Sequence, residues 1–121
     1  MTDLSKKHVL VIGLGISGRV AAKFLLNRHA IVYAVDHNSE LLDRHPEIID
    51  LKNQGLKTHY ESEQLNFKIF DLVVVSPGVP HSNPYYMRAK QEHIEIIGEV
   101  ELACRFIDQP FLAVTGTNGK T

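Results

Sequence analysis

A glycine-rich segment near the N-terminus is the first part of the sequence whose residue types and spacing suggest chemistry. It runs from Gly13 to Gly18, reads GLGISG and fits the pattern G-x-G-x-x-G. Glycines at this spacing let the backbone turn tightly, approach a phosphate closely and pack a helix against the preceding strand. The free N–H groups and partial positive charge at the start of that helix then favour an anion. The segment predicts a nucleotide- or dinucleotide-binding loop, and the alternative is a glycine-rich turn without a ligand.

An acidic residue at the end of the next predicted strand supports the same interpretation. Asp36 stands 18 residues after Gly18. In dinucleotide-binding units, an acidic residue at about this distance hydrogen-bonds a ribose. The alternative for Asp36 is an exposed carboxylate at a strand end.

A second glycine-rich segment closes the sequence. Residues Gly116 to Thr121 read GTNGKT and follow the apolar run 111–114. A phosphate loop needs backbone N–H groups around the phosphates, a Lys toward the β- and γ-phosphates and a Thr hydroxyl for Mg²⁺. Lys120 and Thr121 fit, but Gly116 lies only three residues before Gly119, closer than in the general Walker A pattern. The residues alone leave this segment open between a short phosphate loop and a polar tail.

The segments that must position these motifs alternate between strands and helices. Apolar, β-branched runs predict strands, and apolar residues at helical spacing predict helices. Pro46 is expected to divide one helical stretch into two pieces. Strands are predicted at 8–12, 31–35, 56–60, 70–75, 94–97 and 111–114, and helices at 17–27, 39–54, 84–93 and a last stretch after residue 98. This order favours an α/β fold, a Rossmann-like open parallel sheet with helices on both faces.

Several side chains on these helices have predicted environments. The residues that share one helix side are Val20, Ala21, Phe24 and Leu25 in the first helix, and Val100, Cys104 and Ile107 in the last. Cys104 is therefore predicted to be a small core residue. Glu99 and Glu101 are interpreted as helix-start carboxylates favoured by the helix dipole. Tyr85 and Tyr86 are open between helix packing and contact with a sugar.

The composition is that of one globular domain. The 121 residues carry 13 Lys+Arg and 14 Asp+Glu, a net charge of −1, and 44% are hydrophobic. This length allows roughly two-thirds of the unfolded surface to be buried, and the apolar content excludes intrinsic disorder. We expect no nucleic-acid partner, because there is no basic excess, and no membrane span, because no apolar run approaches ~20 residues. The single Cys104 and the lack of an apolar leader indicate a cytoplasmic protein without an internal disulfide.

The motifs, taken together in this order, resemble the N-terminal part of a Mur ligase. They are GLGISG, Asp36, the SPG loop at 76–78, the IGEVEL segment at 97–102 and TGTNGKT at 115–121. The last motif is typical of Mur-type ligases and the related folylpolyglutamate synthases, and it accounts for the shortened phosphate loop. The first loop, the SPG loop and IGEVEL favour the D-glutamate-adding branch over the alanine-adding branch. The resemblance spans essentially the whole chain.

The resemblance implies two parts of the chain and two sets of binding residues. Residues 1–109 would form a UDP-binding domain, and 110–121 would begin an ATP-binding domain. The residues assigned to the UDP part of the substrate are Gly13, Gly15, Ile16, Ser17, Gly18, Asp36, His37, Asn38, Ser76, Pro77 and Gly78. Those assigned to ATP are Gly116, Thr117, Asn118, Gly119, Lys120 and Thr121, with Thr121 reaching Mg²⁺ in the full-length enzyme. Asp36 would accept the uracil N3–H, but His37 and Asn38 stand where the family often has Thr-Arg, which leaves that part of the base contact open.

The activity implied by the resemblance is ATP-dependent amide-bond formation in cytoplasmic peptidoglycan precursor synthesis, and so in cell-wall biogenesis, cell shape and division. Its substrates would be UDP-N-acetylmuramoyl-L-alanine, D-glutamate and ATP, and the enzyme is expected to be a monomer. None of the implied catalytic residues falls in this chain. Because the helix that should follow the phosphate loop lies beyond Thr121, we expect the chain alone to bind UDP-N-acetylmuramoyl-L-alanine, to bind ATP weakly or not at all, and not to catalyse.

Two other interpretations compete with this one. An NAD(P)-binding regulatory or oxidoreductase domain would explain GLGISG and Asp36, but it leaves the terminal GTNGKT segment without a role. A folylpolyglutamate-type ligase would share the phosphate loop, but that loop would then be expected near the N-terminus, without a Rossmann-like domain before it.

Overall fold

The computed structural model describes residues 4–60 and 64–106. Within them, strands and helices alternate as the sequence predicts. The elements are β1 (His8–Ile12), α1 (Ile16–Asn27), β2 (Ile31–Asp36), α2 (Ser39–Arg44), α3 (Pro46–Asn53), β3 (Lys57–Tyr60), the 3₁₀ turn η1 (Phe67–Ile69), β4 (Leu72–Val75), α4 (Pro84–Gln91), β5 (Ile96–Gly98) and α5 (Glu99–Phe106). The predicted strand at 111–114 and the proposed boundary near residue 109 lie outside the described residues.

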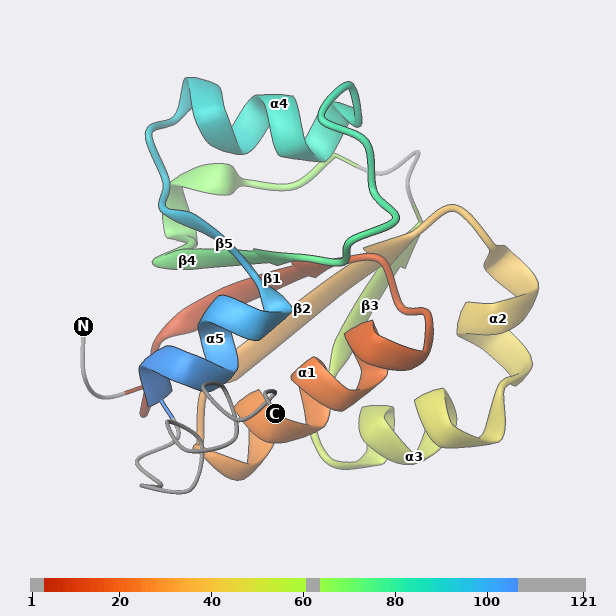
Figure 1. Ribbon diagram of the computed structural model, residues 1–121. Helices are drawn as coiled ribbons and strands as arrows, with labels where there is room; N and C mark the ends of the chain where they lie inside the picture. Colours follow the sequence, from red (N-terminus) through yellow and green to blue (C-terminus); the bar gives the residue numbers. More distant parts are fainter. Residues whose placement is uncertain (1–3, 61–63, 107–121) are drawn as a thin grey trace, which may run out of the picture.

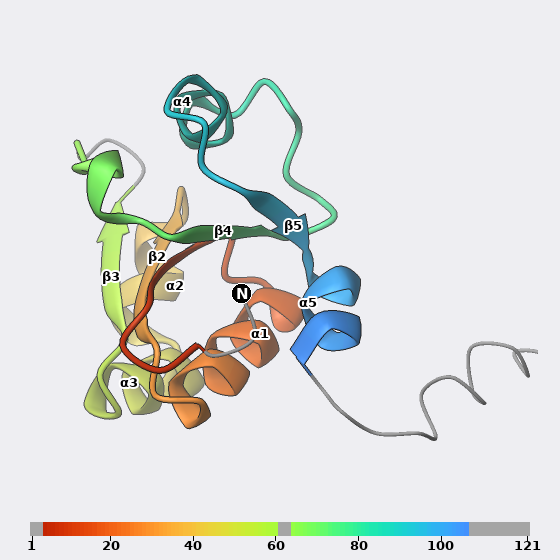
Figure 2. The same ribbon diagram turned by 90° about the vertical axis from the view of Figure 1, so that its left-hand side faces the viewer.

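The five strands form one parallel sheet in the order β3-β2-β1-β4-β5. Helices α1, α3 and α5 cover one face, and α4 with η1 covers the other (Figure 1). The view turned by 90° shows α4 above the sheet and α1 and α3 below it (Figure 2). The predicted open parallel sheet with helices on both faces is confirmed.

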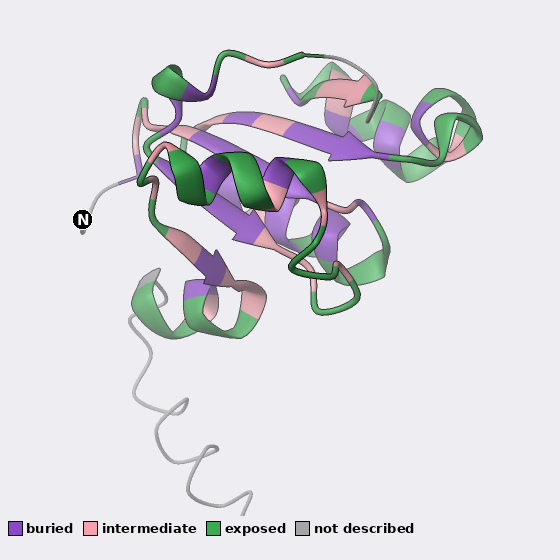
Figure 3. Cartoon of the chain, turned by 90° about the horizontal axis from the view of Figure 1, so that it is seen from above, coloured by how far each residue is buried: buried purple, intermediate pink, exposed green. Residues whose placement is uncertain are grey.

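The central strand β1 serves two hydrophobic layers at once. Val9 and Val11 pack in the layer of α1, α2, α3 and α5, whereas Leu10 and Ile12 pack in the layer of α4 and η1. Figure 3 shows the strands buried through the middle of the molecule and the outer helix faces exposed. A strand covered on both faces has no polar side, which is why its sequence is apolar without alternation.

The helix boundaries follow local signals in the sequence. Pro46 opens α3 directly after α2, as predicted, because a proline tolerates the first turn of a helix but not its interior. Asn83 caps α4, and its Oδ1 accepts hydrogen bonds from the Tyr85 N–H at 2.8 Å and the Tyr86 N–H at 3.3 Å. Gly55 follows α3 with φ +118°, a conformation that favours glycine.

Strand β4 begins later than predicted, at Leu72 instead of residue 70. The 3₁₀ turn η1, which the sequence analysis missed, occupies the preceding residues. Asn66 Oδ1 caps this turn by accepting from the Lys68 N–H at 3.2 Å. The rings of Phe67 and Phe70 then meet edge to face, with centroids 5.6 Å apart. Phe70 therefore closes the turn over the sheet and does not extend the strand.

The prediction that Cys104 is a core residue is wrong. Cys104 is exposed, and Val100 on the same helix side is 78% exposed. The residue of α5 that enters the core is Leu102, which lies roughly 200° around the helix from Val100 at about 100° per residue. Because α5 begins at Glu99 with no loop after β5, the end of that strand decides which side of the helix faces the sheet. On α1, Val20 is likewise exposed, although its neighbours Ala21 and Leu25 are buried as the predicted face requires.

Among the described residues, no helix has the length and apolar character needed to cross a membrane.

Two glycines of the first loop differ sharply in the space around them. A Cβ at Gly18 would lie 2.0 Å from the Gly13 carbonyl oxygen, whereas a Cβ at Gly15 would meet no atom within 4 Å. We expect Gly18→Ala to lower the free energy of unfolding by about 1–3 kcal/mol, because α1 must move off β1. Gly15→Ala should change it by less than about 0.5 kcal/mol. Urea unfolding of both variants measures this difference, and equal losses at the two positions would contradict the packing role of Gly18.

Candidate nucleotide-binding site

A cavity of about 540 Å³ lies at the carboxyl edge of the sheet, between the loops that follow β1 and β4. The chain runs outward from β1 to β3 on one side and then returns to β4 on the other. This is the switch point at which open α/β sheets bind ligands. The lining residues are Ile12, Gly13, Gly15, Ser17, Asp36, His37, Ser76, Pro77, Gly78, Val79, Pro80 and Asn83.

The loop after β1 is anchored to the neighbouring strand β2. Gly13 has φ +95°, a left-handed conformation suited to glycine, and its N–H donates to the Val35 carbonyl at 2.8 Å. The Leu14 N–H donates to Asp36 Oδ2 at 2.7 Å, and the Leu14 side chain is fully buried. The first two amides of the loop therefore point into the protein, and α1 starts immediately after them.

Asp36 fastens two loops. Its carboxylate is buried at the end of β2, where Oδ2 accepts from Leu14 and Oδ1 accepts from the Asn38 N–H at 2.9 Å. The His37 Nδ1 lies 3.5 Å from Oδ1. A carboxylate offers about four lone-pair positions, so two protein amides leave it with acceptor capacity toward the cavity. The predicted contact with uracil stays a prediction, and the structure adds a structural role.

Arg19 holds the same loop from the other side, and the sequence analysis missed it. Its side chain is almost fully buried, its guanidinium donates to the Leu14 carbonyl at 3.0 Å, and its Nε donates to Glu47 Oε1 at 3.0 Å. Glu47 lies in the first turn of α3. The available signal was an arginine directly after the third glycine of the motif, where the helix must pack against the sheet.

The start of α1 is open to the cavity. Gly15 is its N-cap residue and provides no side-chain hydrogen bond, and the first turn contains no acidic residue. The first N–H groups of a helix have no partner within the helix and carry partial positive charge. Gly15 and Ser17 line the cavity at this point. The arrangement suits an anionic group such as a phosphate.

Ser76 joins the two loops of the cavity to helix α5. Its N–H donates to the Ile12 carbonyl at 3.2 Å. Its hydroxyl oxygen lies 3.2 Å from the Gly13 carbonyl oxygen and 2.9 Å from Glu99 Oε2, and its single hydrogen is shared between these two acceptors. Glu99, interpreted from sequence as a helix-start carboxylate, therefore also contacts the loop after β4.

Most of the predicted UDP-binding residues line this cavity, and three do not. Ile16 is exposed, and Gly18 is buried against the Gly13 carbonyl of the loop. Asn38 caps α2, where its Oδ1 accepts from the Leu41 N–H at 3.1 Å. The lining residues that the sequence analysis missed are Ile12, Val79, Pro80 and Asn83. The predicted ATP-binding residues Gly116–Thr121, with Thr121 for Mg²⁺, lie outside the described residues.

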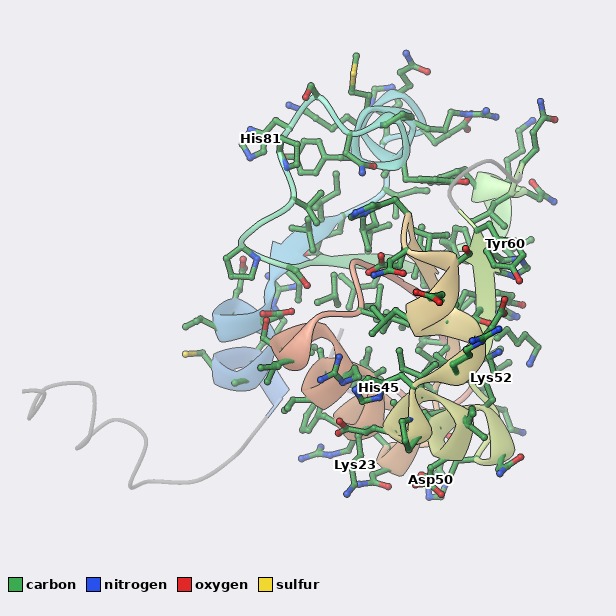
Figure 4. The ribbon with its side chains drawn as sticks, turned by 90° about the vertical axis from the view of Figure 1, so that its right-hand side faces the viewer. Lys23, His45, Asp50, Lys52, Tyr60 and His81 are labelled. Carbon is green, nitrogen blue, oxygen red and sulfur yellow. The ribbon has the colours of Figure 1, made fainter. Side chains whose placement is uncertain are left out.

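Within 4–60 and 64–106, no three His, Cys, Asp or Glu side chains lie close enough to hold a metal ion. Figure 4 shows how far the histidines are spread: His81 precedes α4 on one side of the sheet, and His45 lies between α2 and α3 on the other.

Comparison with known proteins shows one family. A family model described as Mur ligase MurD-like, N-terminal domain, matches residues 7–98. The UDP-N-acetylmuramoylalanine–D-glutamate ligase of Protochlamydia amoebophila is 46% identical over 115 residues, covering 95% of this chain. The ligase of the same name from Acidobacterium capsulatum is 45% identical over 121 residues, covering 98%. The matches cover 26% of each relative, so the chain spans about a quarter of their length.

Solved structures share the fold at low sequence identity. A UDP-N-acetylmuramate:L-alanyl-γ-D-glutamyl-meso-diaminopimelate ligase from Neisseria meningitides has a TM-score of 0.67 and 14% identity, covering 85% of this chain and 32% of its own. The UDP-N-acetylmuramate–alanine ligase MurC from Thermotoga maritima has a TM-score of 0.60 and 20% identity, covering 79% and 21%. Shikimate dehydrogenase from Aquifex aeolicus also matches, with a TM-score of 0.55 and 15% identity over 97% of this chain and 50% of its own. These similarities establish the fold alone.

The anchoring role of Asp36 predicts a stability effect. In Asp36→Asn the side-chain amide can accept only one of the two backbone N–H bonds, and its NH₂ group faces the other donor. We expect the free energy of unfolding to fall by about 1–3 kcal/mol, the cost of an unsatisfied buried donor. Asp50→Asn, at an exposed position of α3, is the control and should stay within about 0.5 kcal/mol. A loss at Asp36 no larger than this control would show that the loop does not depend on the carboxylate.

Proposed function

The chain belongs to the MurD-like N-terminal domains of Mur ligases, and on that premise we propose that its cavity binds the UDP part of UDP-N-acetylmuramoyl-L-alanine. One observation carries the proposal. The uncapped start of α1 opens on a cavity at the switch point of the sheet, beside the buried carboxylate of Asp36. A diphosphate and a base with an N–H donor are the ligand groups that such a pair of features can bind together.

In this proposal, the diphosphate lies against the loop after β1. The amides of Ile16 and Ser17 stand in the first turn of α1, where N–H groups lack helical acceptors. Gly15 carries no side chain that could separate this backbone from a phosphate. Ser76, Pro77 and Gly78 border the opposite wall of the cavity. The anion would therefore be bound mainly by backbone groups and the helix dipole.

The uracil lies beside Asp36 in the same proposal. The carboxylate is already oriented by the amides of Leu14 and Asn38, so little side-chain freedom is lost when a base N3–H donates to it. His37 is exposed at the cavity edge and is the neighbouring side chain that can adjust to the base. Asn38 is engaged in capping α2 and contributes through its backbone.

We propose a wider function for the full-length protein. Its relatives are named UDP-N-acetylmuramoylalanine–D-glutamate ligase, and the corresponding reaction joins D-glutamate to the L-alanine carboxylate in peptidoglycan precursor synthesis. ATP would phosphorylate this carboxylate, and the amine of D-glutamate would displace phosphate from the acyl phosphate. Residues 116–121 are proposed to contact ATP and Mg²⁺, in a monomeric cytoplasmic enzyme. An oxidoreductase domain is the less supported alternative, because the family match and the named relatives are ligases.

The proposed function predicts an order of ligand affinities. We expect the chain to bind UDP and UDP-N-acetylmuramoyl-L-alanine more tightly than NAD⁺, because a uracil N3–H can donate to Asp36 while the diphosphate meets α1. Calorimetric titration with the three ligands measures the order of affinity. Tighter binding of NAD⁺ would contradict the proposed function.

The proposed function also predicts the effect of a side chain at Gly15. In Gly15→Val the new side chain meets no protein atom within 4 Å of its Cβ, so stability should change by less than about 0.5 kcal/mol. The same side chain should keep the diphosphate from the backbone and weaken UDP binding at least about tenfold, a loss near 1.4 kcal/mol. Gly15→Ala should give a smaller loss. If the valine variant binds UDP as tightly as the parent, the loop is only a structural turn and does not contact the diphosphate.

A further inference from the structure

One peptide group sets the direction of the loop after β1. The peptide that joins Gly13 to Leu14 is held at its N–H end by Asp36 Oδ2 at 2.7 Å and at its carbonyl end by the Ser76 hydroxyl at 3.2 Å. The free amides of α1 follow directly after this group. Rotation of this peptide would therefore turn the first amides of the helix away from the cavity.

The Ser76 hydroxyl has a second acceptor. Its oxygen also lies 2.9 Å from Glu99 Oε2, so its single hydrogen is shared between a carbonyl and a carboxylate. The bond to the carboxylate is shorter and charge-assisted, which makes it the stronger of the two. Glu99 thereby fixes the side-chain rotamer in which Ser76 faces Gly13.

Glu99 is well placed for such a role. It is the first residue of α5 and follows β5 without a loop, so the sheet holds its backbone. The side chain lines an apolar groove between α1 and α5 together with Ile16 and Ser17. Glu99 therefore stands beside the first turn of α1.

We propose that Glu99 is a positioning residue for anion binding, acting through the Ser76 hydroxyl on the Gly13–Leu14 peptide. The inference rests on the proposed binding of a diphosphate at α1. Glu99 does not contact the ligand. It holds the loop in the one orientation in which the amides after Gly15 converge on the anion, as Asp36 does from the other end of the peptide.

The test compares two uncharged variants of Glu99. Both lose the negative charge, so the difference between them does not reflect that loss. In Glu99→Gln the side-chain carbonyl can still accept from Ser76, and in Glu99→Ala it cannot. We expect Glu99→Gln to bind UDP about two- to tenfold more tightly than Glu99→Ala, the range of one hydrogen bond. In a Ser76→Ala background this difference should vanish, because the mediator is gone.

Two controls separate positioning from general stability. Glu101, on the same helix, pairs with Arg105 instead of Ser76, so Glu101→Gln and Glu101→Ala should bind UDP equally. Urea unfolding of every variant measures its stability. If the glutamine and alanine variants at 99 differ only in stability and bind UDP alike, or if their difference persists without Ser76, the positioning role is wrong.

Inorganic pyrophosphate serves as a second probe, because it presents the anion without the base. If pyrophosphate binds with the same dependence on Glu99 and Ser76 while UDP binds no better than pyrophosphate, the uridine proposal fails and the positioning role stands. If neither ligand binds the parent chain, both proposals are refuted.

Discussion

The hydrogen bond from the Leu14 amide to the buried Asp36 carboxylate is the constraint on which the rest of the site depends. It ties the loop after β1 to the end of β2, and Arg19 closes the same loop by donating to the Leu14 carbonyl. The Leu14 side chain is buried in the core and further restricts the loop. The start of α1, and with it the direction of the helix dipole, is therefore a consequence of one backbone amide and its partners. The cavity is preorganised by the fold before any ligand enters it.

Much of the fold could be predicted because its signals are local. The apolar run of β1 and Pro46 each act within a few residues of their position, and the structure places both as expected. The side of α5 that faces the core is different in kind. It depends on where β5 ends against β4, which is a feature of the tertiary structure. The alternative apolar side, which carries Val100 and Cys104, is exposed. Amphipathic spacing finds a helix more reliably than it finds the buried side of a short one.

The candidate site shows the same difference between features set by local sequence and features set by tertiary structure. The glycine pattern predicts the loop, but it does not separate Gly15, which faces open space, from Gly18, which is pressed against the Gly13 carbonyl. Arg19 and Glu99 were missed as parts of the site because their partners are distant in sequence. Arg19 meets Glu47, 28 residues away, and Ser76 meets Glu99, 23 residues away. Only the folded sheet brings such pairs together.

Asp36 anchors the loop after β1 and also lines the cavity, and this combination has an evolutionary consequence. A residue that anchors a loop cannot be replaced without a cost in stability, so substitution of Asp36 is constrained whatever the cavity binds. The side chain of His37 is not under this structural constraint, because it is 83% exposed, and it lies beside the same cavity. We therefore expect changes in the ligand specificity of this cavity to arise more readily at His37 than at Asp36. The position that can vary without a cost to the fold is the first residue after the end of β2.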